Sequence, residues 1–431
     1  MSTFTSQLEP LRLPAFRRLF LATLGSSVGT LMAAVALTID VANRTKGSPH
    51  TGLWVALVLV VEFLPTVIVG LFLGPLLDRL PRRTLMIAAD AVRVCVFAAL
   101  PFAPSAGAVV ALAFVAGLAT GFFRPAVYAG VPNLVEAALL PKANALLQSV
   151  ENLSWTIGPI LGAVAGPNIS YAINAVSFAV SIVLIAGIPA KLLQSERALT
   201  RGYWRDLADG FSATLRSRSM VAVLVAWGIA SFGLGAANVS QIFLAKHTFS
   251  AGSFGYGLLY GAIGAGLVIG AFFSARFLEA WGVAVTYGGG LTVMAVSLVG
   301  AALSPNIWIA AACCVVLGVG NGTAVACNAL LVQRGTFDAM RGRALTFVMS
   351  ATYLAVAIGE LAGGAFVHEG VAPAIPRWLW GIAGIALGIA AVAGWAIARK
   401  LGGETAAEGE HAQEAALATA NQETRPNVQP G

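Results

Sequence analysis

The chain has 431 residues, of which 58% are hydrophobic and only 10% are charged, with a mean hydropathy of +0.82. A soluble domain carries about 25% charged residues, so this composition excludes soluble enzymes, disordered chains, collagen-like chains and coiled coils and indicates a protein whose solvent is largely lipid. The formal net charge of +7 would also suit a nucleic-acid binder, and the positions of the charges decide between the two classes.

Apolar runs long enough to cross a bilayer, about 20 residues each, follow one another along the chain. They do not alternate apolar and polar residues as the strands of a barrel do, so they predict helices. We predict twelve spans, at residues 19–41, 53–76, 84–102, 107–130, 143–166, 170–189, 220–244, 255–276, 283–303, 306–330, 343–366 and 377–398. The expected fold is therefore an all-α membrane protein with twelve transmembrane helices.

The 26 Lys and Arg residues are distributed unevenly between the predicted loops. With the N-terminus inside, Arg93 and Arg124 lie within spans and nearly all the others fall in inner loops. The outer loops hold only Arg44, Lys46, Lys246 and Arg377. This asymmetry predicts a multi-pass protein of the cell membrane with both termini in the cytoplasm. It also places the positive charge beside anionic lipids rather than in a groove, so lipids and not nucleic acid are the expected partners.

The longest loop divides the chain into two halves of six spans. We predict an N-terminal half at 1–189, a cytoplasmic loop at 190–219, a C-terminal half at 220–400 and a disordered cytoplasmic tail at 401–431. Four glycines of the first half each have a counterpart at one constant offset in the second; the pairs are Gly117 and Gly318, Gly121 and Gly322, Gly158 and Gly359, and Gly162 and Gly363. Parallel six-span repeats are a recurrent plan of transporters, with the substrate site between the halves. We expect a monomer.

The most specific motif lies between spans 2 and 3 and runs Gly-Pro-Leu-Leu-Asp-Arg-Leu-Pro-Arg-Arg. Its candidate functional residues are Gly74, Asp78, Arg79, Arg82 and Arg83. The glycine permits close approach of helices, and the arginines face the inner leaflet, where they can pair with acids or lipid phosphates. A basic turn that only sets the topology would explain the arginines but not the ordered spacing.

At these residues the chain resembles the Major Facilitator Superfamily, although Leu77 and Pro81 depart from the signature of that loop. Further stretches resemble its drug:proton antiporter branch, which includes macrolide efflux proteins and the enterobactin exporter. They include Asp90 and Arg93 in span 3 and Arg341-Gly-Arg343 before span 11. The resemblance implies a twelve-helix fold with alternating access and export driven by the proton gradient, with no other cofactor. It also implies that the loop residues, with Asp90 and Arg93, stabilise one conformation and so act in gating.

Gly158, Pro159 and Gly162 form a candidate hinge in span 5. The proline removes a backbone donor and bends the helix, and Ser154 with the two glycines presents a small-residue face for tight packing. The element resembles part of the antiporter signature and therefore favours export.

Four acidic residues within spans are the proton-coupling candidates: Glu62, Glu151, Glu360 and Asp40. A charged side chain at the bilayer centre costs about 2.5–3.5 kcal/mol, so each of these residues is expected to have a partner or a function. A lone carboxyl can exchange a proton, as an antiporter requires, or it can stay neutral beside a backbone carbonyl. Glu151 has a third possibility, which is to pair with Arg124 one span away. Asp90 and Arg93 are three residues apart and share a helix face.

Polar and aromatic residues at similar depth are candidates for the wall of a cavity. They are Arg124, Asn152, Trp155, Asn174, Phe232, Asn238, Gln241, Asn328 and Tyr353. Aromatic side chains with few fixed charges suit a bulky amphiphilic compound. The sequence has no Gly-Lys-Ser/Thr loop for ATP, no metal-ligand pattern and no catalytic cluster, so we expect neither an enzyme nor a metal site. We therefore predict proton-coupled export of a drug, antibiotic or siderophore, with uptake of a metabolite or a non-transporting membrane sensor as alternatives.

Overall fold

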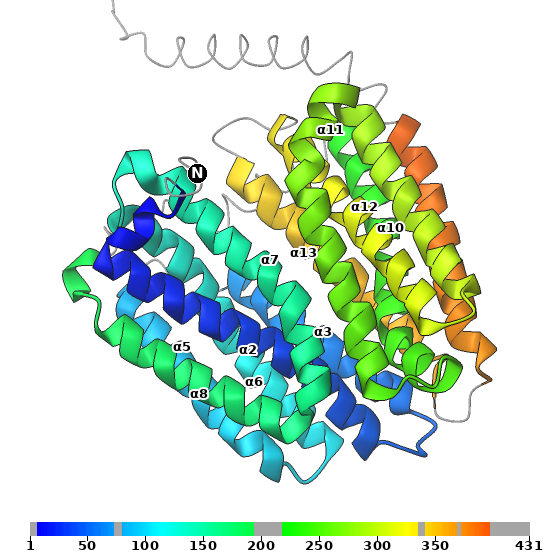
Figure 1. The fold of residues 1–431 in the computed structure, drawn as a ribbon, viewed down its shortest axis with the longest axis horizontal. Coiled ribbons are helices and arrows are strands. Elements are labelled where there is room, and N and C mark those ends of the chain that lie inside the picture. The colour runs from blue at the N-terminus through cyan, green and yellow to red at the C-terminus, as the bar shows by residue number, and fades with distance from the viewer. Residues whose placement is uncertain (1–6, 73–79, 194–217, 335–340, 369–371, 397–431) are drawn as a thin grey trace, which may run out of the picture.

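The computed structural model describes residues 7–72, 80–193, 218–334, 341–368 and 372–396. Over these ranges the chain is a bundle of long helices joined by short turns (Figure 1). The helices are α2 (Pro14–Arg44), α3 (Thr51–Phe72), α5 (Arg82–Ala99), α6 (Ala106–Gly130), α7 (Leu140–Ala165), α8 (Pro167–Ala186), α10 (Arg218–Phe243), α11 (Gly252–Leu303), α12 (Ile307–Arg334), α13 (Arg341–Gly364) and the helix Ala374–Ala396. Short turns lie at Glu9–Arg12, Leu100–Phe102, Val131–Asn133, Ala137–Leu139, Ala190–Leu193 and Leu244–Thr248.

The described helices reproduce the twelve predicted spans. Helix α11 covers two of them, because Gly282 adopts a non-helical conformation with φ 75° and ψ 167° that divides it into two arms. Only glycine reaches this region of positive φ without strain. Within the described ranges, ten helices are long and apolar enough to cross a membrane by composition. Helix α7 is not among them, because polar residues such as Lys142, Gln148 and Glu151 lower its hydropathy. The prediction of an all-α fold with twelve spans is confirmed.

Several predicted features lie outside the described residues. They include Gly74, Asp78 and Arg79 of the motif between spans 2 and 3, most of the 190–219 loop and the whole of the 401–431 tail. Arg82 and Arg83 begin α5 and are described.

Local sequence explains how consecutive helices are joined. Gly166 ends α7 with φ 75°, and Pro167 begins α8 at a position where its missing N–H costs nothing. Ser105 caps α6, since its side chain accepts from the backbone N of Ala108 at 3.2 Å. These two connections are therefore tight.

The repeated glycines make equivalent contacts in the two halves. In α6, Gly117 packs on Val61 and Pro65 of α3, and its counterpart Gly318 of α12 packs on the first arm of α11. In α7, Gly162 lies against the carbonyl of Met32 in α2, and its counterpart in α13 lies against α10 in the same way. A Cβ at these positions would overlap the backbone of the neighbouring helix. The glycine repeat therefore encodes one helix-packing plan used twice, and the prediction of two six-helix halves is confirmed.

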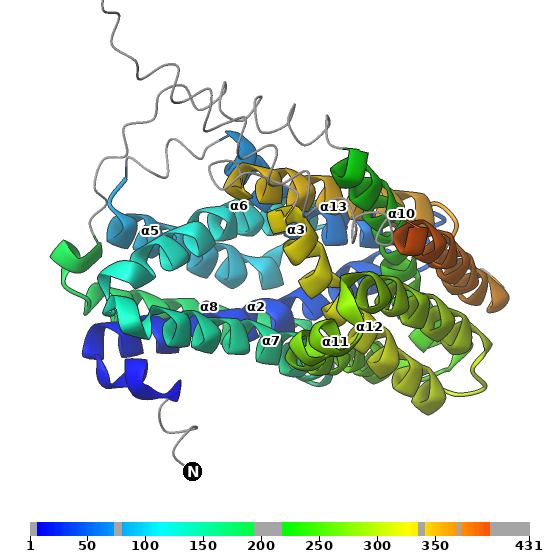
Figure 2. The ribbon, with the colours of Figure 1, turned by 90° about the horizontal axis from the view of Figure 1, so that it is seen from above.

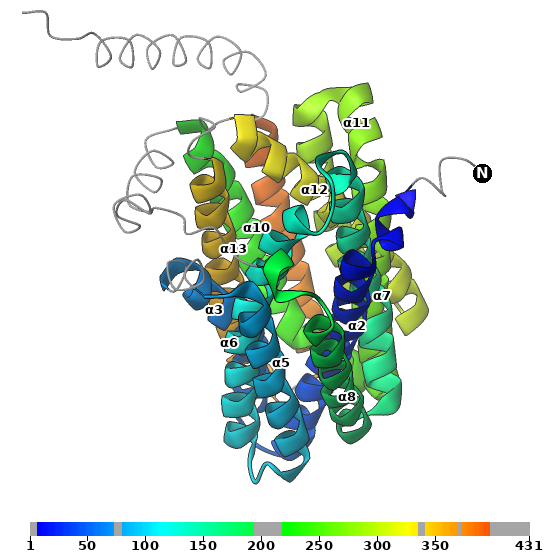
Figure 3. The same ribbon diagram turned by 90° about the vertical axis from the view of Figure 1, so that its left-hand side faces the viewer.

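Arginines mark one end of the N-terminal half, which is the half that Figure 3 views from the side. Arg18 at the start of α2 donates to the carbonyl of Gly187, and Arg83 at the start of α5 donates to that of Ala186. We call this end of the molecule the basic end. The opposite end, where α2 finishes at Arg44 and α3 begins, is called the far end.

The two halves meet through α7 with α11 and through α3 with α13 (Figure 2). On the first arm of α11, Gly257, Gly261 and Gly264 let the backbone approach residues 155–163 of α7 closely. Near the far end, Gly52 of α3 lies against Gly364 of α13. Figure 1 shows the helices of the halves converging toward the lower part of the view and diverging toward its upper part. The halves are therefore closed against each other at the far end.

Candidate functional site

A cavity of about 160 Å³ lies within the N-terminal half, and we call it the N-terminal cavity. Helices α2, α3, α5, α6 and α7 supply most of its wall. Its charged lining residues are Glu62, Arg93, Arg124 and Glu151. Two acids and two bases thus surround one small space.

Arg124 and Glu151 form an ion pair across α6 and α7. The Arg124 Nη2 lies 2.7 Å from Glu151 Oε1, and the hydroxyl of Tyr128 donates to the same oxygen at 2.9 Å. Half of the Arg124 side chain is exposed, and this exposure is to the cavity that it lines. The pairing with Arg124 that the sequence left open for Glu151 is present, so the adjacent guanidinium compensates the charge of this carboxylate.

Asp90 and Arg93 form a second ion pair within α5. Both residues are almost fully buried, with 0% and 2% exposure, and Arg93 donates to the Asp90 carboxylate. The guanidinium carbon lies 4.3 Å from the ring centre of Phe123 and 4.2 Å from that of Phe178. Two aromatic faces therefore replace the hydration of the cation. Such a pair costs much free energy to break and favours a fixed position of α5 against α6 and α8.

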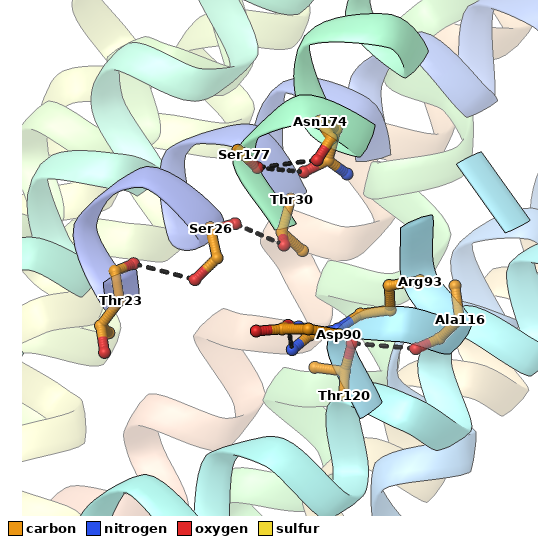
Figure 4. A network of polar contacts seen from close by, with 9 residues as sticks. All are labelled: Thr23, Ser26, Thr30, Asp90, Arg93, Ala116, Thr120, Asn174 and Ser177. Carbon is orange, nitrogen blue, oxygen red and sulfur yellow. Dashed lines mark hydrogen bonds and ion pairs between the residues drawn. The ribbon is translucent and has the colours of Figure 1, made fainter. Parts of the chain in front are cut away.

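Hydroxyl side chains of α2 form a stripe along the N-terminal cavity: Thr23, Ser26 and Thr30 (Figure 4). The Thr30 hydroxyl donates to the carbonyl of Ser26 at 2.7 Å, and the Ser26 hydroxyl donates to that of Thr23 at 3.2 Å. Because these protons are used within the helix, the hydroxyl oxygens remain available as acceptors. The N-terminal cavity is thus polar as well as charged.

A second cavity of about 320 Å³ lies within the C-terminal half, and we call it the C-terminal cavity. The described residues that line it include no Asp, Glu, Lys, Arg or His. Its aromatic lining residues are Phe63, Trp155, Trp227, Tyr260, Tyr353 and Trp380. Three predicted cavity residues, Asn238, Gln241 and Asn328, supply polar groups. The structure thus brings these amides together with Trp155 and Tyr353 around one space.

Two stacked aromatic pairs stand between the cavities and join the halves. Phe63 of α3 stacks on Tyr353 of α13 with centroids 5.5 Å apart, and Trp155 of α7 stacks on Tyr260 of α11 at 5.9 Å. Phe63, Trp155 and Tyr353 line both cavities. We call these four residues the aromatic partition. A change in the angle between the halves has to move it, since each pair has one ring on each half.

Glu62 of α3 and Glu360 of α13 lie on opposite halves beside this partition. They are within electrostatic range of each other and of the hydroxyls of Tyr256 and Tyr260. Glu360 is 1% exposed, and Asn238 approaches its carboxyl without completing a hydrogen bond of normal geometry. The Oε1 of Glu62 is likewise buried without a hydrogen-bond partner. Two carboxyls with unsatisfied oxygens therefore face the junction of the halves.

Residues 5–428 match the family described as transmembrane secretion effector, MFS_3. The chain belongs to this family. It is 22% identical to macrolide efflux protein A of Streptococcus pyogenes over 320 residues, which are 71% of this chain and 79% of that protein. It is 30% identical to multidrug transporter MdfA of Yersinia pestis bv. Antiqua (strain Angola) over 227 residues, which are 49% of this chain and 54% of that protein.

Solved structures agree with the fold of this chain. A bacterial homologue of the iron transporter ferroportin in an inward-facing state matches with a TM-score of 0.71 at 14% identity, over 90% of this chain and 99% of that one. A peptide transporter POT in complex with sulfate matches with a TM-score of 0.72 at 13% identity, over 90% and 95% of the two chains. The family and the fold are those of transporters of the major facilitator type, and the chain is a multi-pass membrane protein.

The remaining predicted residues of the secretion effector lie outside the two cavities. Asp40 pairs with Arg44 at 2.8 Å and accepts from the hydroxyl of Tyr171 at 3.0 Å, so it is satisfied near the far end. Asn152, Asn174 and Phe232 are not among the lining residues of either cavity. Within the hinge, Gly158 and Gly162 face α2 while the carbonyl of Pro159 faces Gly257 of α11.

Sequence reasoning missed Tyr256 and Tyr260, which approach both carboxyls, and the hydroxyl stripe of α2. Each carried a readable signal. The two tyrosines are one helical turn apart, and Thr23, Ser26 and Thr30 recur at spacings of three and four. A polar stripe in an otherwise apolar span marks the side that does not face lipid.

Proposed function

We propose that this secretion effector exports a small amphiphilic compound in exchange for protons, with Glu62 and Glu360 carrying the protons. The observation that carries the proposal is the placement of two unsatisfied carboxyls on opposite halves, at the junction that must open in a rocking motion. Similarity to a macrolide efflux protein and to a multidrug transporter supports export of drug-like compounds. The proton gradient is the only energy source that the proposal needs.

The orientation follows from the charges. With the basic end in the cytoplasm, as the distribution of Lys and Arg predicts, closure at the far end makes this an inward-facing conformation of a protein in the cell membrane. A compound then enters the cavities from the cytoplasm. A fluorescent protein fused to the C-terminus tests this placement, because it folds and fluoresces only if that terminus is cytoplasmic.

The carboxyls link the protons to this motion. While both are protonated, the far end can stay closed around them without a buried charge. Loss of the protons to the cytoplasm leaves two anions within electrostatic range of each other, with three carboxylate oxygens that have no hydrogen-bond partner among the described residues, and their repulsion favours separation of the halves at the far end. Protons from outside then neutralise the acids and allow closure. This order moves protons in and the compound out, which is antiport.

The test is an efflux assay in bacteria that lack their own drug exporters. Cells expressing the protein are loaded with a panel of fluorescent drugs, and retention is compared with and without a protonophore. We expect lower retention that the protonophore abolishes, and we expect Glu62→Gln and Glu360→Gln to remove it. Glu279→Gln is the matched control, since Glu279 is an exposed acid of α11.

Four outcomes would contradict the proposal in different ways. Unchanged retention across the panel would contradict drug export. Higher intracellular levels of the drugs would favour uptake instead. Export that survives the protonophore removes proton coupling. Full activity of both Glu→Gln variants would mean that another acid carries the proton, and Glu151→Gln is then the next variant to examine.

A further inference from the structure

Among the described residues, the wall of the C-terminal cavity has no ionised side chain and includes two amides that each have an unpartnered atom. Gln241 is 1% exposed and Asn328 is 2% exposed, and both line the cavity from different helices, α10 and α12. The Nε2 of Gln241 and the Oδ1 of Asn328 have no hydrogen-bond partner in the part of the chain that the structure describes. A buried polar atom without a partner costs free energy that a bound molecule can recover. These two amides therefore indicate a ligand that has both a hydrogen-bond acceptor and a hydrogen-bond donor.

The rest of the wall sets the shape and polarity of that ligand. Trp155, Trp227 and Trp380 present large flat faces, and the indole N–H of Trp380 is already used, since it donates to the carbonyl of Ala237 at 3.1 Å. These rings thus offer apolar surface rather than further hydrogen bonds. A cavity of about 320 Å³ falls within the range of small-molecule sites, roughly 300–1,000 Å³.

We propose that the C-terminal cavity is the substrate site and that it takes an uncharged, aromatic-bearing amphiphile with an amide-like donor and acceptor, in preference to a cation of the same shape. This inference rests on the proposed function, of which it names the substrate class. Gln241 donates to the carbonyl of the compound and Asn328 accepts from its N–H or O–H. The tryptophans cover its apolar part.

The preference against cations follows from where the charges lie. A cation entering this cavity would lose its hydration and find no anion among the described lining residues. Glu360 is an acid beside Asn238, which lines the cavity. In the far-end-closed conformation, however, the proposed mechanism keeps Glu360 protonated and neutral. Aromatic faces attract cations too, but an uncharged compound gains the same apolar contact without the cost of desolvating a charge.

A consequence is that proton and substrate occupy different residues. Glu62 lines the N-terminal cavity, and neither Glu62 nor Glu360 lines the C-terminal cavity. The compound then does not displace a proton from a shared carboxylate. Coupling instead runs through the aromatic partition, because Trp155, Tyr260 and Tyr353 line the substrate cavity and also join the halves.

The experiment measures equilibrium binding to the purified full-length protein by the change in its tryptophan fluorescence. Two isosteric probes are used: N-(3,3-dimethylbutyl)-2-naphthamide, which is uncharged, and N-(2-trimethylammonioethyl)-2-naphthamide, which is a cation. We expect the uncharged naphthamide to bind at least about tenfold more tightly. We expect Gln241→Met and Asn328→Leu each to weaken its binding about tenfold, the loss typical of one buried neutral hydrogen bond.

Asn152→Leu is the matched control, because this amide lies on α7 outside both cavities and bonds to Gln148 at 3.2 Å. It should leave binding unchanged. The proposal is overturned if the cation binds as tightly as the uncharged probe, if both amide variants bind it within twofold of the parent protein, or if the folded parent protein does not bind it. Since no transport is measured, a failure of proton coupling leaves this result unaffected, and preferential binding of the cation leaves proton coupling unaffected.

Discussion

The N-terminal and C-terminal cavities lie in halves that share one packing plan, yet they differ in chemistry. The N-terminal cavity is lined by two acids and two bases, and the described lining of the C-terminal cavity has no ionised group. The glycines that set the helix spacing are repeated in both halves, whereas the charges are not. The repeat therefore conserves the scaffold, and each half has acquired its own polar groups within it.

This difference suggests a division of labour. In the N-terminal half the Asp90–Arg93 pair lies within α5 and its arginine packs on aromatic rings of α6 and α8, whereas two amides of the C-terminal half each have an atom without a partner among the described residues. The two unsatisfied carboxyls lie on opposite sides of the boundary between the halves. Under the proposed function, stability, recognition and coupling then fall on separate residues, and each can be altered alone.

The largest expected effect comes from breaking the buried pair of the N-terminal half. Arg93→Met leaves the Asp90 carboxylate alone at 0% exposure, and removal of one partner of a buried pair costs about 3–5 kcal/mol. The double variant Asp90→Asn with Arg93→Met removes both charges and should recover most of the loss. Thermal unfolding followed by fluorescence-detected size exclusion measures both. Equal losses in the single and double variants would show that the aromatic contacts of Arg93, and not its charge, stabilise this half.

The next effect tests whether the two halves depend equally on their repeated glycines. Gly162→Ala places a methyl group against the carbonyl of Met32, and Gly363→Ala, at its counterpart, places one against the backbone of Ala236. Backbone atoms cannot rotate away, so each substitution should cost about 1–3 kcal/mol. Gly388→Ala is the control, because a methyl group there meets open space and alanine favours a helix. A loss in one half only would mean that the shared plan is not equally tight in both.

A smaller effect is expected from moving charge into the uncharged cavity. Asn328→Asp places a carboxylate beside the tryptophans, and it should raise the affinity for the trimethylammonium naphthamide about tenfold, or about 1.4 kcal/mol, while lowering that for the uncharged probe. The same fluorescence titration measures both constants. If the ratio of the two affinities does not change, Asn328 does not contact the bound compound.

The sequence predicts the fold well because the lipid solvent acts on each span separately. A run of about 20 apolar residues is a local property, and so is a glycine face. Contacts across the halves are not local. Glu62 and Glu360 are far apart in the chain, and nothing in either span indicates that Tyr256 and Tyr260 lie within electrostatic range of both. Sequence spacing was enough to predict that Asp90 and Arg93 share a helix face. Whether Glu151 pairs with a base or stays free to carry a proton depended on the position of Arg124 in the fold.

The smallest effect is expected from the ion pair between Glu9 and Lys142, which lies outside the predicted spans and is more exposed than the buried pair of Asp90 and Arg93. Lys142 Nζ lies 2.8 Å from Glu9 Oε2, and the hydrogen bond and charge of Lys142 lower the pKa of Glu9 below its ordinary value of 4.5. An acid whose pKa is lowered by folding stabilises the folded state above the unfolded pKa, and that contribution disappears as the pH falls through the folded pKa. Glu9→Gln should therefore lower Tm by only about 1–2 °C at pH 7, since exposed pairs contribute little, and the difference from the parent protein should vanish below pH 4.5. Glu136→Gln, at an exposed acid of a neighbouring turn, serves as the control. A loss at pH 7 as large as that of Arg93→Met would mean that the basic end depends on this pair as much as the interior depends on its own.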